Sequence, residues 1–129
     1  MRLLLDTNVF YWALSRRQKL SSKAVKAITD PANELILSCA SIWELITKVG
    51  TGKLDLPVAP ADFDHYCERL GIAAVLSIHP AHVYQLRALP RAHDDPFDRM
   101  LVAQAQVEDL RLVSADTFIA EHYMHDVIW

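Results

Sequence analysis

The sequence is poor in cysteine and contains no long hydrophobic run. Its two cysteines, Cys39 and Cys67, lie in apolar surroundings without the spacing of metal ligands, so we expect two reduced thiols and no zinc site. No segment approaches the roughly 20 apolar residues of a membrane span, and the apolar run that ends at Asp6 is too short for a signal peptide. These absences predict a soluble, cytoplasmic protein that does not enter a membrane.

The chain has enough apolar residues for one core. With 129 residues, of which 52% are hydrophobic, it is expected to form a single domain over residues 1–129. The net charge of −3 is unevenly divided, because residues 1–53 carry eight basic and four acidic side chains, whereas residues 54–129 carry five and twelve. Five basic residues between positions 16 and 26 could contact a phosphate backbone, although a solvated helix face is the simpler explanation for each of them.

Short apolar runs alternate with segments of helical periodicity, without internal repeats. Strands are predicted at residues 2–5, 34–38, 73–77 and 111–113, with a short edge strand at 127–129. Helices are predicted at residues 8–14, 22–28, 41–49, 61–70 and 80–89, and from Pro96 onward. This alternation is typical of an α/β fold in which helices cover both faces of a central parallel sheet.

The segment from Asp94 to Ala105 is central to the interpretation. Asp95 stands at an N-cap position, Pro96 at the first position of a helix and Asp98 within its first turn. Carboxylates are favourable at the positive end of a helix dipole, so helix capping alone could explain these acids.

Other acids follow the predicted strands. Asp6 follows the first strand, Glu44 follows the second after a turn, and Asp116 follows the strand at 111–113. The carboxyl ends of parallel strands meet at one edge, which is where ligands bind in open α/β sheets. We therefore expect these three acids to converge with Asp98 at this edge. The alternative for Glu44 is a capping box with Ser41.

A carboxylate cluster at this edge would suit a hard divalent cation. Mg²⁺ prefers a few carboxylates together with water and substrate phosphate oxygens. A bound divalent ion lowers the pKa of its water and stabilises charge on a phosphate, so the predicted reaction is phosphodiester hydrolysis. Without a metal, carboxylates about 4–6 Å apart would raise one another's pKa values, which makes such a cluster a poor arrangement for stability alone.

Four segments stand out by their order and spacing. They are Leu-Leu-Asp-Thr-Asn at residues 4–8, Ser-Ile-Trp-Glu-Leu at 41–45, His-Asp-Asp-Pro-Phe-Asp-Arg at 93–99 and Leu-Val-Ser-Ala-Asp at 112–116. Together they resemble the PIN-domain ribonucleases, specifically the VapC toxins of bacterial type II toxin–antitoxin pairs. The resemblance covers nearly the whole chain and implies a three-layer α/β/α domain. It also implies an endoribonuclease that depends on Mg²⁺ or Mn²⁺ and hydrolyses RNA with metal-activated water.

The same resemblance carries roles onto individual residues. It makes four acids the catalytic and metal-binding residues: Asp6, Glu44, Asp98 and Asp116. It gives supporting roles to Thr7, Asn8 and Ser114, and to Asp95 and Arg99 of the Asp-Pro-Phe-Asp-Arg signature found in one subgroup. Asp94 departs from that subgroup, in which an arginine more often follows the histidine. This departure puts RNA contacts in question rather than catalysis.

Other functions fit the pattern less well. A metal-free ribonuclease would need acid–base histidines, but the six histidines are scattered without a common placement, and His79 and His82 are expected to be surface or capping residues. A phosphatase or receiver domain is disfavoured because Asp6-Thr7-Asn8 lacks a second aspartate. The main alternative is a non-catalytic RNA- or protein-binding module with a PIN-like fold, whose acids cap helices.

Apolar helix surfaces indicate protein partners. The helix after Asp6 is apolar on all sides, and Trp43 lies outside the buried stripe of its own helix. Neighbouring helices of the same chain could bury these side chains, and tryptophans 12, 43 and 129 are expected in the core or an interface rather than on RNA bases. The family resemblance implies a homodimer and a small antitoxin, whose apolar segment we expect to cover Tyr11, Trp12 and Trp43.

Overall fold

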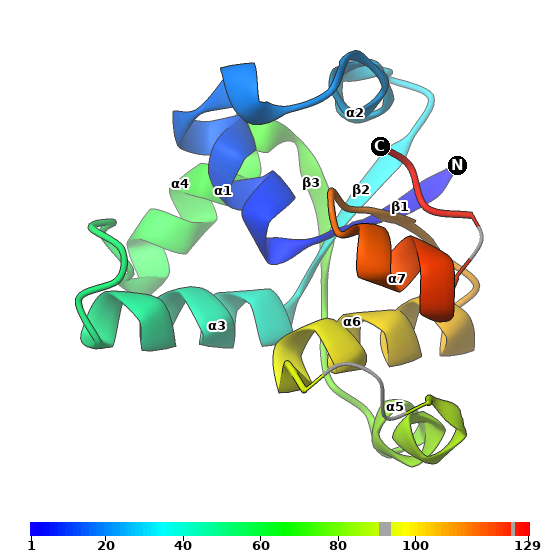
Figure 1. The fold of residues 1–129 in the computed structure, drawn as a ribbon. Helices are drawn as coiled ribbons and strands as arrows, with labels where there is room; N and C mark the ends of the chain where they lie inside the picture. The colour runs from blue at the N-terminus through cyan, green and yellow to red at the C-terminus, as the bar shows by residue number, and fades with distance from the viewer. Residues whose placement is uncertain (91–93, 125) are drawn as a thin grey trace.

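The sheet consists of four parallel strands in the order β3–β2–β1–β4 (Figure 1). The computed structural model describes residues 1–90, 94–124 and 126–129. The strands are β1 (Arg2–Leu5), β2 (Glu34–Ser38), β3 (Ile72–Leu76) and β4 (Arg111–Val113), so the four main predicted strands are confirmed. The prediction of an edge strand at 127–129 is wrong, because this segment forms only an isolated parallel bridge, between Val113 and Ile128.

Seven α-helices are present in the described part of the chain. They are α1 (Thr7–Ser15), α2 (Ser22–Thr29), α3 (Cys39–Gly50), α4 (Pro60–Leu70), α5 (Pro80–Gln85), α6 (Pro96–Val107) and α7 (Thr117–His122). Two 3₁₀ turns, η1 (Arg17–Lys19) and η2 (Leu86–Ala88), interrupt the connections, so the single helix predicted at 80–89 is divided. Helix α7 has no counterpart among the predicted helices. None of the helices described is long and apolar enough to cross a membrane.

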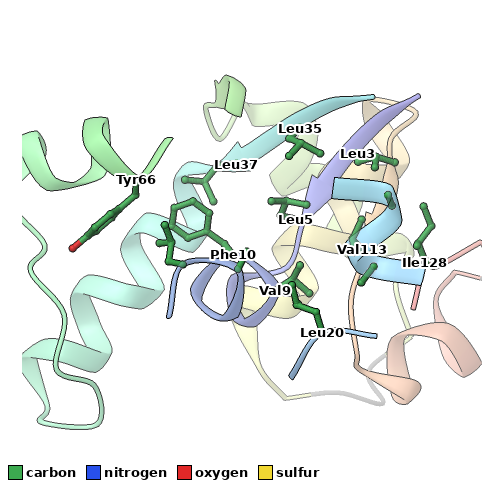
Figure 2. Close-up of a cluster of buried hydrophobic side chains, with 14 of the residues drawn as sticks. Leu3, Leu5, Val9, Phe10, Leu20, Leu35, Leu37, Tyr66, Val113 and Ile128 are labelled. Carbon is green, nitrogen blue, oxygen red and sulfur yellow. The ribbon is translucent and has the colours of Figure 1, made fainter. Parts of the chain in front are cut away.

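Alternate residues of β1 belong to two separate hydrophobic cores. Leu3 and Leu5 pack with Val9 and other side chains of α1, α2 and α4 on one face of the sheet (Figure 2). Leu4 packs with Leu101 and other side chains of α6 and α7 on the opposite face. All three leucines are fully buried, which explains why this central strand is a continuous apolar run. The predicted three-layer α/β/α architecture is therefore confirmed.

Helix α3 begins two residues earlier than predicted. Ser38, the last residue of β2, is its N-cap and accepts a 3.0 Å hydrogen bond from the backbone N–H of Ala40. Ser41 lies inside the helix, where its hydroxyl accepts a 2.9 Å hydrogen bond from the hydroxyl of Thr7. The predicted capping box of Ser41 with Glu44 is therefore wrong, because Glu44 lies in the second turn of α3 rather than at its start.

Helix α6 begins as predicted. The carboxylate of Asp95 accepts hydrogen bonds from the backbone N–H groups of Phe97 and Asp98, and Pro96 occupies the first helical position. Proline fits this position because its missing N–H would have no partner within the helix. The cap fixes where the first turn starts and thereby positions Asp98.

Candidate active site

The acids lie where strands end and helices begin. Asp6 directly follows β1, and its backbone N–H donates a 3.0 Å hydrogen bond to the carbonyl of Val113 in β4. Asp116 is the N-cap of α7, two residues beyond Ser114. Helix α3 carries Glu44 and helix α6 carries Asp98. Figure 1 shows the starts of these helices gathered at the carboxyl edge of the sheet.

Asp6 is a buried carboxylate in this group. Its residue is 5% exposed, and Oδ2 accepts a 2.6 Å hydrogen bond from the hydroxyl of Ser114. Burial raises the pKa of Asp6 to about 6, and the negative charges of Glu44 and Asp116 act in the same direction. The hydrogen bonds from Ser114 and from the backbone of Thr7 oppose this shift. Asp6 is thus held in a site that destabilises its ionised form relative to water.

The pKa of Asp98 is also raised, in part by the same acids. Burial is the largest cause of a pKa raised to about 8, and the charges of Asp6, Asp95, Glu44 and Asp116 add to it. These charges come from residues far apart in the chain. The structure therefore places Asp6, Glu44, Asp116 and Asp95 within electrostatic reach of Asp98.

Glu44 is almost completely buried, and among the described residues Lys48 is its close cationic neighbour. Its Oε2 lies 2.6 Å from Nζ of Lys48, one helical turn further along α3. Its Oε1 is buried and has no hydrogen-bond partner within the described part of the chain. A buried, unpaired carboxylate oxygen costs free energy unless a donor or a cation reaches it.

Helix capping accounts for some of these acids but not for others. Asp95 caps α6, and Asp116 caps α7 by accepting a 2.9 Å hydrogen bond from the backbone N–H of Phe118. Asp6 precedes α1, but its side chain makes no capping hydrogen bond. Glu44 lies inside α3 and cannot cap it. Capping alone therefore does not explain why Asp6 and Glu44 are buried at this edge.

The supporting residues predicted from the sequence occupy different environments. Ser114 and Thr7 are buried, and Thr7 donates to the hydroxyl of Ser41, which joins the start of α1 to α3. Asn8 is exposed in the first turn of α1. The guanidinium of Arg99 donates to the carbonyls of Pro90 and Leu86, at 2.7 and 3.3 Å. These bonds tie the segment before α6 to the helix, so Arg99 acts on the position of α6.

A buried polar network beside the site has no counterpart in the sequence-based predictions. The hydroxyl of Ser38 donates to Oε1 of Gln104 at 2.5 Å, and the amide of Gln104 donates to the carbonyl of Ser77 at 3.3 Å. His82 is fully buried, which contradicts its predicted surface position, although it does form a cap by accepting the backbone N–H of His79. Neither periodicity nor spacing reveals this network, because its members come from separate elements. In contrast, the contact of Lys48 with Glu44 could have been predicted from the sequence, because Lys48 stands four residues after Glu44 in a predicted helix.

The donor set fits a divalent cation, although no ligand cage is closed. Among residues 1–90, 94–124 and 126–129, no three His, Cys, Asp or Glu side chains are grouped so as to hold a metal ion. The four acids nevertheless offer oxygen ligands of the kind that Mg²⁺ and Mn²⁺ prefer. Oε1 of Glu44 has no hydrogen-bond partner among the described residues, and burial, together with neighbouring carboxylates, raises the pKa values of Asp6 and Asp98, so a bound cation would stabilise this edge. His93 and His125 lie outside the described residues.

Comparisons with known proteins agree with this architecture. Residues 3–123 match the family described as the PIN domain. Ribonuclease VapC22 of Mycobacterium tuberculosis is 30% identical over 122 residues, which cover 93% of this chain and 91% of that protein.

Two solved structures have a similar fold. VapBC2 from Rickettsia felis, bound to a DNA fragment from their promoter, has a TM-score of 0.69 and 12% identity, covering 98% of this chain and 97% of that chain. A toxin–antitoxin complex from Klebsiella pneumoniae has a TM-score of 0.63 and 19% identity, covering 98% and 96%. The match to the family spans nearly the whole chain, and the fold and the relative agree with it. The chain therefore belongs to the PIN-domain family, in its VapC group.

Proposed function

We propose that this protein is a divalent-metal-dependent endoribonuclease and the toxin of a toxin–antitoxin pair. The ribonuclease name of the 30% identical relative supports the reaction class. The observation that carries the proposal is the convergence of charge on Asp6 and Asp98. These residues lie in distant parts of the chain, yet burial raises the pKa of both, and the charges of Glu44 and Asp116 add to both shifts.

Four side chains would hold Mg²⁺ or Mn²⁺: Asp6, Glu44, Asp98 and Asp116. When bound, the ion supplies a water of lowered pKa and stabilises charge on the phosphate. Ser114 orients Oδ2 of Asp6, and the Asp95 cap positions the turn that carries Asp98. Asn8, exposed next to the buried Thr7, is available to contact RNA. The protein side chains thus hold the acids in place, and Lys48 supplies a positive charge 2.6 Å from Oε2 of Glu44.

The test is cleavage of RNA with Mn²⁺, with excess chelator, and with the Asp98→Asn variant. We expect cleavage only by the wild type with metal. Asp62→Asn is a matched control, because the Asp62 carboxylate accepts the backbone N–H of Ala59 at the start of α4 and lies outside the acidic group. It should cleave as the wild type does. Cleavage by Asp98→Asn, or in excess chelator, would contradict the metal site, and RNA binding without cleavage would favour the non-catalytic module.

We also propose that an antitoxin binds the exposed apolar side chains of α3 and β3. Trp43, Ile46 and Val75 are 58%, 45% and 46% exposed. Ile46 and Val75 line a groove of about 400 Å³ whose other walls come mainly from α3, α4 and the preceding loop. The toxin–antitoxin complexes among the structures of similar fold support a partner of this kind.

Helix α1 contributes less to this surface than its sequence suggested. Trp12 lies 6.0 Å from Trp129, measured between ring centroids, and both Tyr11 and Trp12 are partly buried against the core. We therefore centre the proposed antitoxin surface on Trp43 and Ile46. A homodimer is part of the same proposal, and sedimentation analysis of the purified chain would test it.

A further inference from the structure

The two oxygens of Glu44 have different surroundings. Nζ of Lys48 lies 2.6 Å from Oε2, and the side chains of Lys48 and Glu44 are 32% and 5% exposed. Oε1 is buried and without a hydrogen-bond partner among the described residues. The ion pair therefore satisfies one oxygen of the buried Glu44 carboxylate and leaves the other oxygen without a hydrogen-bond partner among the described residues.

Helix geometry separates Lys48 from the other acids. Side chains in an α-helix lean toward its N-terminus, so Lys48 covers the turn that carries Glu44, and Glu44 leans toward the start of α3. The start of α3 is joined to α1 beside Asp6 by the hydrogen bond between Thr7 and Ser41. Lys48 thus reaches Glu44 from the C-terminal side of α3, whereas the acidic group lies toward its N-terminal end.

We propose that Lys48 is a positioning residue that holds Oε2 of Glu44 and so presents Oε1 as the single oxygen offered to a divalent cation. This inference rests on the proposed metal site. A cation on Oε1 would satisfy the unpaired oxygen without displacing the ammonium of Lys48. Groups that orient metal ligands change metal affinity by about 10–100-fold when they are removed.

The test is the dissociation constant of Mn²⁺, measured directly by titration calorimetry on variants of the full chain. Lys48→Met removes the contact, and we expect it to raise the dissociation constant about tenfold or more. Lys48→Arg keeps the charge, but its fork can bind both oxygens of a carboxylate and would then occupy Oε1, so it should also weaken binding. Lys53→Met is the matched control, because it removes the same charge from an exposed position just beyond α3.

A purely electrostatic effect of Lys48 on the metal predicts the opposite order of Mn²⁺ affinities. If Lys48 only repels or competes with the metal, Lys48→Met should bind Mn²⁺ at least as tightly as Lys53→Met does, and Lys48→Arg should match the wild type. That result would overturn the inference. In a Glu44→Gln background, adding Lys48→Met should change Mn²⁺ affinity no more than Lys53→Met does, and a full additional loss would also contradict it.

The outcomes separate this inference from the proposed function. Tight Mn²⁺ binding by the wild type, lost in Asp98→Asn but unaffected at Lys48, would leave the metal site standing and remove the role of Lys48. Absence of Mn²⁺ binding by the folded wild type would overturn both. If Lys48→Met fails to fold, as judged by circular dichroism, Lys48→Arg decides the question, because it retains the positive charge beside Glu44.

Discussion

The hydroxyl of Ser114 donates a 2.6 Å hydrogen bond to Oδ2 of Asp6, although the two residues are 108 positions apart in the chain. Both residues are buried, and they follow the neighbouring strands β4 and β1. The same hydroxyl accepts the backbone N–H of Asp116 at 3.1 Å. Ser114 therefore orients Asp6 and the backbone of a second acid, and it lowers the pKa of Asp6 against the effect of burial.

We expect Ser114→Ala to reduce the free energy of unfolding by about 1–3 kcal/mol, because a buried carboxylate oxygen loses its donor. Urea denaturation in the presence of chelator measures this change. Ser15→Ala is a control, since the hydroxyl of Ser15 donates to the carbonyl of Tyr11 at an exposed position. Equal effects of the two substitutions would show that the Ser114 bond contributes no more than a surface one.

The metal-free protein should lose stability as the pH rises from about 4 to about 8. Asp6 and Asp98 have pKa values of about 6 and about 8 in the folded state, against 3.8 ordinarily. Within this interval the folded state binds more protons than the unfolded state, so the free energy of unfolding falls with increasing pH. The contribution is fully present below pH 3.8 and is lost as the pH passes the folded-state values. Thermal unfolding in chelator over this range tests the sign.

Asp98→Asn should remove most of this pH dependence. The variant carries a neutral side chain at all pH values, so at pH 8 without metal it should be at least as stable as the wild type. It should also lose the increase in unfolding temperature that Mn²⁺ gives to the wild type, since a ligand stabilises only a state that binds it. A variant that unfolds at clearly lower temperature, with the pH slope unchanged, would contradict the charge cluster.

The cleaved RNA should carry a 5′-phosphate and a 3′-hydroxyl. Attack by water on phosphorus with departure of the ribose 3′-oxygen leaves the phosphate, which now carries the water oxygen, on the 5′-oxygen, whereas attack by the ribose 2′-hydroxyl expels the 5′-oxygen and produces a 2′,3′-cyclic phosphate. Analysis of the ends of a cleaved oligonucleotide distinguishes the two. Cyclic ends, formed equally well in chelator, would instead indicate acid–base catalysis by histidine.

His82 should be important for stability but not for metal binding. Its Nδ1 accepts the backbone N–H of His79 at 2.9 Å, so the proton is assigned to Nε2, which donates to Glu108 at 2.8 Å. We expect His82→Leu to cost about 2 kcal/mol or more, because it removes both bonds at a fully buried position. His82→Asn, which can still accept from His79, should cost less.

The control for His82 is His122→Leu on the exposed surface of α7, which removes a 3.1 Å contact with the carbonyl of Phe118 and a ring contact with Phe118, and which we expect to cost less than His82→Leu because the position is exposed. Urea denaturation compares the three variants, and Mn²⁺ titration of each should give the wild-type affinity. An effect of His82→Leu as small as that of His122→Leu would show that the buried bonds contribute little.

Charged substitutions at Trp43 and Ile46 should weaken binding of the antitoxin. Ile46 is exposed, and Trp43 is exposed although its ring contacts that of Phe97 at 4.8 Å between centroids, so folding and Mn²⁺ binding of Trp43→Glu and Ile46→Glu are measured first, and we expect both variants to retain them. Val83→Glu on α5 is the control, because Val83 is exposed to a similar extent, 47%, on a different helix. The test is co-purification of the antitoxin after co-expression with each variant, followed by calorimetric measurement of the dissociation constant of the complex. Wild-type affinity in both α3 variants would place the partner elsewhere.

The sequence alone predicted the α/β architecture and the acids that follow the strands. Apolar runs separated by helical periodicity predicted the four strands. In β1 the run is continuous because the strand is buried on both faces, as at Leu3, Leu4 and Leu5, whereas β3 is an apolar strand at the edge of the sheet with Val75 exposed. The Asp95-Pro96 pair predicted the start of α6, because capping and proline preferences depend on local backbone geometry. Asp6 and Asp116 could be assigned to one edge from the parallel topology.

Only the tertiary structure decided what surrounds each acid. The Ser41-x-x-Glu44 pattern is a local signal for a helix start, yet α3 starts at Cys39 because Ser38 caps it, and Ser41 instead pairs with Thr7. The burial of His82 and the Ser114–Asp6 bond likewise join residues far apart in sequence. Such contacts depend on how separate elements pack, which periodicity does not encode. The same packing buries Glu44 so that Lys48 contacts Oε2 of its carboxylate. Oε1 has no hydrogen-bond partner among the described residues.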